Sequence, residues 1–384
     1  MKKIVIAPDS FKGSASAAEV ARAIATGLRR VWPAANCIEV PMADGGEGTL
    51  DAVLGAGGER RRWPVRGASG ATVEAAFGVV DHGGRRVAVI EVAQVVGITD
   101  PVGMGVPVGI RSTLGVGDLI RHGLDLGIRE FMIGLGGSST NDGGAGMLAG
   151  LGLRLLDAAQ APVPPHPEAL AQVRAVDAAG LDPRLADARI TIMSDVNNPL
   201  TGPRGATAIF GPQKGVTPDL QARYDAAIAG FAGCAETALG RRAADHPGAG
   251  AAGGLGFALQ LLGAEFRSGA EVLADLLRLD EALAGADWAI TGEGRTDLQT
   301  LLGKGPQVVA SRARRLGVPV TLLSGGIDRS ALPALGQTFS GCFSLVFGPV
   351  TLAEAMAGTT SMLADSAEQM ARLLASRPAG QGLT

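Results

Sequence analysis

The stretch KIVIAPDSFKGSASAAEVARAIATGLRRVWP, residues 3–33, holds one complete strand–loop–helix unit. It opens with a short apolar, β-branched run, which is typical of a buried strand. Ser16 and Glu19 then have the spacing of a capping box, and apolar residues recur every three or four positions after them. Pro33 ends this helical pattern because proline cannot continue the hydrogen-bonded turns. The unit therefore predicts an α/β fold.

The same alternation of strand and helix recurs along the rest of the chain. Further short apolar runs predict strands at 38–42, 131–135, 190–193, 288–291, 320–323 and 343–347. Between residues 64 and 92 the pattern changes to paired β-rich runs around His82-Gly83-Gly84, which is typical of a hairpin. Alternation of this kind favours largely parallel sheets with helices on both faces.

The chain has 384 residues, enough for two domains. Segments 1–65 and 285–384 share the clearest strand–helix rhythm, so we predict that they form one discontinuous α/β domain. Residues 66–284 would then form an inserted second α/β domain. The 58 glycines accompany 46% hydrophobic residues, so we expect them in the turns and loops of a folded enzyme rather than in a disordered chain.

The composition argues against several classes of protein. The net charge is −3, and the basic run at residues 60–62 has no aromatic ladder beside it, so nucleic acid is not an expected partner. The three cysteines lie far apart and the four histidines form no H-E-x-x-H motif, which disfavours a disulfide framework and a zinc site. The apolar runs are too short for a signal peptide or a membrane span. We therefore expect a cytoplasmic protein with no membrane partner.

Polar loops, five of which contain glycine, follow six of the predicted strands. They are PDSFKG (8–13), ADGGEG (43–48), GLGGSSTNDGG (134–144), SDVNNP (194–199), TGEGRTD (291–297) and LSGG (323–326). An ordinary loop needs glycine for its turn and Ser or Asp for a helix cap, but not several acids and glycines within six residues. Ligands of parallel sheets bind beyond the carboxyl ends of the strands, where these loops are expected.

Phosphoryl transfer needs four parts that these loops can supply. Backbone N–H groups hold phosphate oxygens, one or two carboxylates hold Mg²⁺, a lysine neutralises charge, and an aspartate accepts the proton of the attacking hydroxyl. The predicted cradle for nucleotide phosphates comprises Gly136, Gly137, Ser138, Ser139, Thr140, Asn141 and Asp142, together with Lys304. A plain capped turn is the alternative for residues 136–142.

The predicted catalytic residues are Asp195, Lys12 and Asp297. Asp195 ends an apolar strand, where we expect a buried carboxylate that acts as the general base, and helix capping is the alternative. Glu293 and Asp297 are predicted to bind Mg²⁺. The segment around them is not a Walker A motif, because Lys304 is followed by glycine.

The predicted acceptor-binding residues are Asp9, Ser10, Asp44 and Glu47. The alternative for residues 9–12 is a plain Asp/Ser turn with a solvated lysine. Gly254-Leu255-Gly256 is expected to allow close helix packing rather than to bind a ligand. Gln213-Lys214 in FGPQKG is expected to form an exposed turn, and its role is left open.

Seven stretches, in this order, resemble the bacterial glycerate kinases of the first type. They are IAPDSFKGS (6–14), ADGGEGT (43–49), IGLGGSSTNDGGAGM (133–147), SDVNNPL (194–200), IFGPQKG (209–215), PGAGAAGGLG (247–256) and ITGEGRTDLQTLLGKGP (290–306). The match spans nearly the whole chain, so it is far more specific than a lone glycine-rich loop. The stretch 91–117 differs from the commoner versions, and Asp118 stands where the family usually has Glu.

The resemblance implies a kinase that uses ATP and Mg²⁺ to convert D-glycerate into 2-phosphoglycerate. It also implies two α/β domains, one of them flavodoxin-like and discontinuous, with the active site in the cleft between them. Homo-oligomerisation is left open. The alternatives are a kinase of this family that acts on another small hydroxy acid, a non-catalytic regulator that binds a nucleotide or sugar phosphate, and a Mg²⁺-dependent phosphatase.

Overall fold

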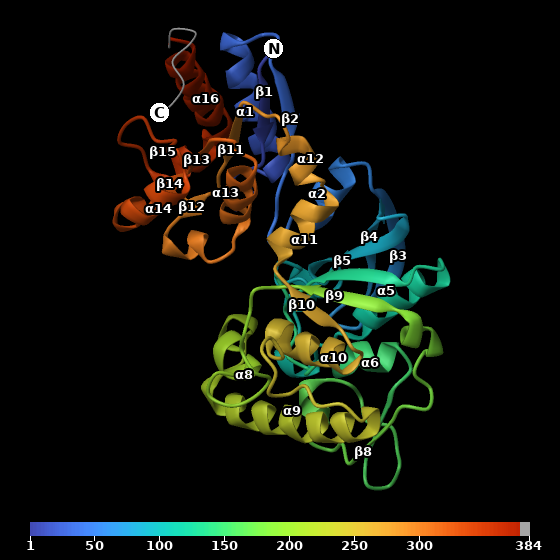
Figure 1. The fold of residues 1–384 in the computed structure, drawn as a ribbon. Coiled ribbons are helices and arrows are strands. Elements are labelled where there is room, and N and C mark those ends of the chain that lie inside the picture. Colours follow the sequence, from blue (N-terminus) through green and yellow to red (C-terminus); the bar gives the residue numbers. More distant parts are fainter. Residues whose placement is uncertain (377–384) are drawn as a thin grey trace. The chain divides into compact units, whose positions relative to one another are not determined.

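The computed structural model describes residues 1–376, and the tail 377–384, whose sequence predicts fraying, lies outside them. The chain divides into two compact units, each with its own sheet (Figure 1). Unit 1 has one hydrophobic cluster on each face of its sheet, and unit 2 has one large cluster. Unit 1 comprises Met1–Asp44, Asp51–Ala56 and the segment from Ala270 onward. Unit 2 comprises Gly45–Leu50 and Gly57–Gly269.

Unit 1 is built on a five-stranded, fully parallel sheet. Its strands are β1 (Lys3–Ile6), β2 (Asn36–Glu39), β11 (Trp288–Thr291), β13 (Val320–Ser324) and β15 (Gly341–Ser344). They lie in the order β15-β13-β11-β1-β2, which read from β2 is the flavodoxin-like order 2-1-3-4-5. The order reverses between β1 and β11, and ligands of such sheets bind at this switch point. A separate two-stranded sheet pairs β12 (Arg295–Thr296) with β14 (Gly326–Ile327).

Helices cover both faces of the sheet of unit 1, because β1 is apolar on both of its faces. Ile4 and Ile6 share a core with α1 and α16, whereas Val5 shares the other core with α13. The predicted capping box of Ser16 and Glu19 is confirmed at the start of α1. The helices are α1 (Ala17–Val31), α2 (Thr49–Gly55, begun in unit 2), α11 (Gly269–Leu276), α12 (Leu279–Leu283), α13 (Gly305–Arg315), α14 (Leu332–Thr338), α15 (Leu352–Ala357) and α16 (Thr359–Ala375).

Unit 2 is built on a six-stranded mixed sheet in the order β10-β9-β6-β5-β4-β3. Its strands are β3 (Glu59–Arg66), β4 (Thr72–His82), β5 (Arg85–Glu91), β6 (Glu130–Gly134), β9 (Arg189–Met193) and β10 (Glu265–Arg267). The first three are antiparallel, and the hairpin predicted at Gly83-Gly84 joins β4 to β5. From β5 to β10 the neighbours are parallel. A small antiparallel pair joins β7 (Arg154–Leu156) to β8 (Ala175–Asp177).

The helices of unit 2 pack on this sheet around one large core. They are α3 (Ala93–Val96), α4 (Pro101–Met104), α5 (Leu114–Asp125), α6 (Ala145–Gly150), α7 (Pro167–Leu170), α8 (Ala206–Phe210), α9 (Pro218–Leu239) and α10 (Leu255–Leu261). Short 3₁₀ turns include η3 (Pro212–Lys214) and, in unit 1, η5 (Leu298–Leu301). The close packing predicted at Gly254 is confirmed, since a Cβ there would lie 2.4 Å from the Cα of Gly143.

The predicted fold class is confirmed: both units are α/β, and their sheets are largely parallel. The predicted strand at 288–291 matches β11 residue for residue. The last predicted strand, 343–347, is placed too late, because β15 ends at Ser344. Within the described part of the chain, no helix has the length and apolar character needed to cross a membrane.

Candidate active site

Acidic residues gather at the switch point of unit 1. Asp9 follows β1 and Glu293 follows β11, the strand beside it. The amide of Asp9 donates to the carbonyl oxygen of Gly292 at 2.8 Å, which ties the two loops together. Asp44 follows β2, on the other side of β1. The parallel sheet thus brings together three carboxylates that the sequence placed in separate loops.

The carboxyl of Asp9 is poised to exchange a proton near neutral pH. Its pKa is raised to about 7, first by burial and then by the negative charge of Asp44, with a smaller contribution from Glu293. The amide of Ser10 donates to Oδ1 of Asp9 at 2.6 Å, which partly offsets this shift because it favours the ionised form. A strongly perturbed carboxyl at a switch point is a candidate for function.

Glu293 is held by two hydroxyl groups and faces a lysine. Its Oε1 accepts hydrogen bonds from Thr300 at 2.6 Å and from Thr296 at 3.2 Å. Its Oε2 lies 3.9 Å from Nζ of Lys304. Burial raises the pKa of Glu293, and the two threonines and Lys304 oppose that shift. A cation near Oε2 would therefore stabilise the ionised form of this buried carboxyl group.

Asp297 and Lys304 both lie at helix starts beside this carboxylate. Asp297 caps the 3₁₀ turn η5, accepting from the amide of Gln299 at 2.8 Å. Lys304 is the N-cap of α13, and a Cβ on the next residue, Gly305, would lie 3.4 Å from Oδ2 of Asp9. The positive end of the α13 dipole thus adjoins Asp9.

The polar loops of unit 2 also converge at one sheet edge, and glycine makes this possible. A Cβ on Gly134 would lie 2.1 Å from the carbonyl oxygen of Gly45, and a Cβ on Gly136 would lie 2.7 Å from the Cα of Gly46. A Cβ on Gly45 would in turn lie 2.7 Å from the carbonyl oxygen of Met193. Gly45 and Gly46 therefore pack closely against the carboxyl ends of β6 and β9, where the predicted cradle and Asp195 begin.

The loop 136–142 carries backbone donors that other parts of the protein leave unused. The amide and hydroxyl of Ser139 both donate to the carbonyl oxygen of Val96, at 2.8 and 2.9 Å, which fixes the middle of the loop. Among residues 1–376, no hydrogen-bond partner accepts from the amides of Gly136, Gly137, Ser138, Thr140 or Asn141. Successive unpaired N–H groups of this kind are typical of an anion-binding loop.

The side chains of the same loop point into the protein, where their hydrogen bonds fix the conformation of the loop. Asp142 is fully buried, and its carboxylate accepts from the amide and hydroxyl of Thr113, both at 2.8 Å, and from the amides of Gly144 and Gly146. Burial raises its pKa, and these four donors oppose the shift. Asn141 is also fully buried and donates to Thr207. Contact between these two residues and a nucleotide would therefore have to come from their backbone.

Two buried cations lie against this loop, and neither was predicted from the sequence. The predicted exposed turn at Lys214 is wrong: the residue is 2% exposed, and its Nζ donates to the carbonyl oxygen of Thr140 at 2.7 Å and to Oγ of Ser138 at 3.1 Å. Arg111 is 3% exposed and donates through Nη1 to the carbonyl oxygens of Ser139 and Lys214. Because FGPQKG is polar and turn-forming, the local pattern gave no indication of this burial.

The other predicted residues lie at the surface of their own units. Asp195 is exposed, two positions beyond the end of β9, so the expectation of a buried carboxylate there is wrong. The chain leaves the sheet at Met193, and the strand's burial ends with it. Lys12 and Asp44 are exposed in unit 1, and Glu47 is exposed in unit 2. Exposed side chains of this type are accessible to a small polar substrate.

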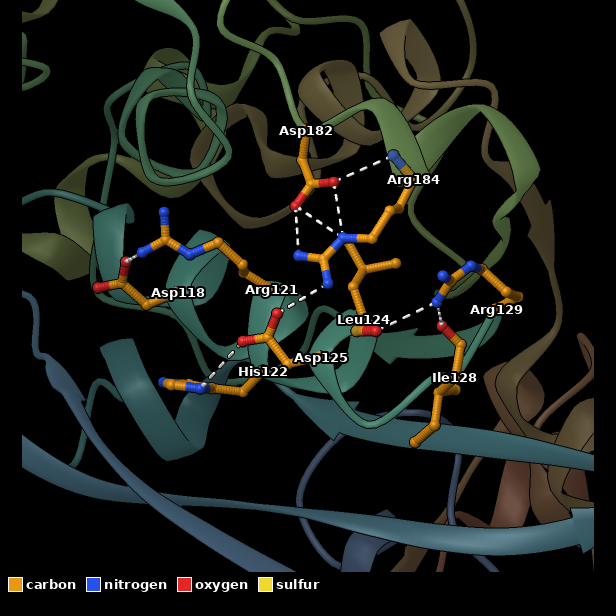
Figure 2. Close-up of polar contacts among 9 residues, drawn as sticks. All are labelled: Asp118, Arg121, His122, Leu124, Asp125, Ile128, Arg129, Asp182 and Arg184. Atoms are coloured by element: carbon orange, nitrogen blue, oxygen red, sulfur yellow. Dashed lines mark hydrogen bonds and ion pairs between the residues drawn. The ribbon is translucent and has the colours of Figure 1, made fainter.

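Asp118 belongs to a structural network of charges on α5 (Figure 2). It accepts from Arg121 at 3.2 Å and from Arg66 of β3 at 2.9 and 3.0 Å. At the end of the same helix, Arg184 donates to Asp125 at 2.8 Å. Asp118 therefore ties α5 to β3, and its contacts include none of the predicted site residues.

The comparisons with known proteins identify the family. The family model described as "Glycerate kinase family" matches residues 4–375. The glycerate kinase of Bacillus subtilis is 43% identical over 96% of this chain and 97% of its own, and the glycerate 2-kinase of Escherichia coli is 40% identical over 97% and 98%. A crystal structure from Salmonella typhimurium, described as a candidate glycerate kinase 2, superposes with a TM-score of 0.86 at 41% identity and covers 98% of both chains. The chain belongs to the glycerate kinase family.

Proposed function

We propose that the protein transfers the γ-phosphate of ATP to the 2-hydroxyl of D-glycerate, with Mg²⁺ as the metal. The observation that carries this proposal is the loop 136–142, with its run of unpaired amides and the buried cations Lys214 and Arg111 against it. An arrangement of this kind favours a multiply charged anion such as a nucleotide phosphate. The Escherichia coli relative is named a glycerate 2-kinase, which supports the choice of the 2-hydroxyl.

The carboxylates of unit 1 fit a Mg²⁺ ion bound together with a nucleotide. Within residues 1–376, no group of three or more His, Cys, Asp or Glu side chains could hold a metal ion by itself. Magnesium bound to a nucleotide usually takes only one or two carboxylates, with phosphate and water as the other ligands. Glu293 and Asp297 would supply these, since Glu293 has one oxygen held by threonines and the other facing Lys304. The bound ion would neutralise charge on the transferring phosphate.

The remaining residues would bind and activate the acceptor. Asp195 would accept the proton of the 2-hydroxyl, and its exposure leaves it accessible to a small acid. Lys12 would attract the glycerate carboxylate, with Asp9, Ser10, Asp44 and Glu47 as partners for its hydroxyl groups. Lys304 would hold nucleotide phosphates from the start of α13.

The test is ADP formation with ATP and Mg²⁺ against a panel of D-glycerate, L-glycerate, glycolate, lactate and buffer alone. The proposal predicts ADP that depends on D-glycerate at a kcat well above that of the other acids. A preference for another acid would point to a family member with a different acceptor. ADP formed without acceptor would indicate a phosphatase, and a thermal shift with ATP but no ADP would indicate a regulator.

A further inference from the structure

We propose that Lys214 is a positioning residue that holds the loop 136–142 in its anion-binding conformation and supplies much of the positive potential there. Its amine does this through Ser138 and Thr140 rather than by touching the ligand. The inference rests on the proposed function, because it takes the anion at this loop to be the phosphate chain of ATP.

The position of Lys214 favours an indirect role. It ends the turn η3, and Gly215 follows at φ 95°, a left-handed conformation that turns the chain toward α9. Within residues 1–376, the amine has two acceptors and both are neutral: the hydroxyl of Ser138 and the carbonyl oxygen of Thr140. At 2% exposure it is out of reach of a ligand bound on the outer side of the loop.

Lys214 and Arg111 together set the direction of the loop's peptide groups. Nζ of Lys214 donates to the carbonyl oxygen of Thr140, and Nη1 of Arg111 donates to the carbonyl oxygen of Ser139 at 3.1 Å. No peptide bond within residues 1–376 is cis, and a trans peptide directs its C=O and N–H in opposite directions. The amides that follow, those of Thr140 and Asn141, therefore point away from the two cations. Both are among the amides left unpaired within the described residues.

Arg111 also fastens Lys214 itself. The same Nη1 donates to the carbonyl oxygen of Lys214 at 2.9 Å, and Nε and Nη2 donate to that of Val106 at 3.0 and 2.8 Å. Arg111 thus links Lys214 of η3, Val106 and the loop 136–142 in one buried cluster. Because its contact with Lys214 is to the backbone carbonyl oxygen, the guanidinium positions this residue and adds its own positive charge to the cluster.

The charge balance of this cluster favours an anion and links its binding to protonation. The charged groups that act on Lys214 are Asp142 and Arg111. Burial lowers the pKa of Lys214 to about 7, Arg111 lowers it as well, and Asp142 opposes the shift. The charged form is therefore present below about pH 7 and is lost above it. An anion at the loop favours that form, so binding above pH 7 takes up a proton and weakens as the pH rises.

The experiment is calorimetric titration of the full-length protein with ATP between pH 6 and 8.5, in buffers of different ionisation enthalpy. Lys214→Met removes the amine but keeps the apolar stem. We expect it to weaken ATP binding at least tenfold at pH 6.5, to flatten the pH dependence and to abolish proton uptake at pH 8. Lys2→Met, a surface change, should alter none of these. Asp9→Asn should retain the proton uptake, although Asp9 also titrates near neutral pH.

Ser138→Ala keeps the test valid if Lys214→Met does not fold. Removing one acceptor lowers the pKa of Lys214 further, so the midpoint of the pH dependence should move to lower pH. Unchanged affinity and proton uptake in folded Lys214→Met, or an unmoved midpoint in Ser138→Ala, would overturn the inference alone. Failure of the wild-type protein to bind ATP at any pH would instead overturn the proposed function on which it rests.

Discussion

The side-chain amine of Lys214 donates to the carbonyl oxygen of Thr140 at 2.7 Å, although 74 residues separate the two in sequence. This contact joins two glycine-rich segments that look like independent surface loops in the sequence. It places a buried charge beneath unpaired amides, which is the physical reason for assigning the phosphates to this loop.

The first prediction concerns Asp195, the proposed general base. Asp195→Asn keeps the size and polarity of the side chain but cannot accept a proton, so kcat should fall about 10²- to 10⁴-fold with little change in KM for ATP. Asp187→Asn, an exposed aspartate elsewhere in unit 2, is the matched control and should behave as the wild type. Steady-state kinetics at pH 7.5 measures both. An unchanged kcat in Asp195→Asn would remove this residue as the base.

The second prediction concerns the hydroxyl groups that hold Glu293. Thr300→Val removes the shorter of its two hydroxyl donors at nearly constant volume, so the pKa of Glu293 should rise further above its ordinary value. The Mg²⁺ concentration for half-maximal rate should then increase several-fold at pH 6, and this difference should shrink at pH 8.5. Thr300→Ser keeps the hydroxyl and should restore the wild-type response. An identical Mg²⁺ dependence in all three proteins would exclude Glu293 as a metal ligand.

The third prediction follows from the raised pKa of Asp9. The pKa of Asp9 in the folded state, about 7, lies above its ordinary value of 3.8, so ionisation of Asp9 destabilises the folded state as pH rises from about 4 to 7. Asp9→Asn removes this cost, and it should raise the free energy of unfolding by on the order of 1–2 kcal/mol at pH 8. At pH 4 the two proteins should unfold alike. Urea unfolding at both pH values measures the difference, and a variant that is less stable at pH 8 would contradict the assigned pKa.

The fourth prediction tests the close approach of the loops in unit 2. Gly134→Ala places a methyl group 2.1 Å from the carbonyl oxygen of Gly45, so the backbone must shift. We expect a loss of about 2–4 kcal/mol in the free energy of unfolding. Gly230→Ala, at an exposed position of α9 with open space around it, should instead gain about 0.5–1 kcal/mol. Equal effects of the two changes would mean that the glycine at 134 is not required for packing.

The strands and the places of the polar loops could be predicted from the sequence because both depend on local patterns. The apolar run at 288–291 and the loop after it illustrate this, since β11 is followed directly by Gly292 and Glu293. The parallel pairing of β1 with β11 then brings Asp9 beside Glu293. This could be expected, because the carboxyl ends of parallel strands lie at the same edge of a sheet.

The side-chain environments could not be predicted in the same way, because they depend on residues far away in the chain. Arg111 lies 103 residues before Lys214 and buries it, although FGPQKG has the composition of an exposed turn. Asp195 was expected to be buried and is exposed, which is the opposite error. The strand before it is apolar and buried, but the chain leaves the sheet two residues earlier, so the aspartate is exposed.

Phosphorus NMR of the product formed from ATP, Mg²⁺ and D-glycerate tests the central claim most directly, because it reads which hydroxyl carries the phosphate. The account predicts a single phosphomonoester whose phosphorus couples to the one proton on C2, which is the pattern of 2-phosphoglycerate. A signal coupled to the two protons on C3 would show transfer to the 3-hydroxyl and would contradict the account.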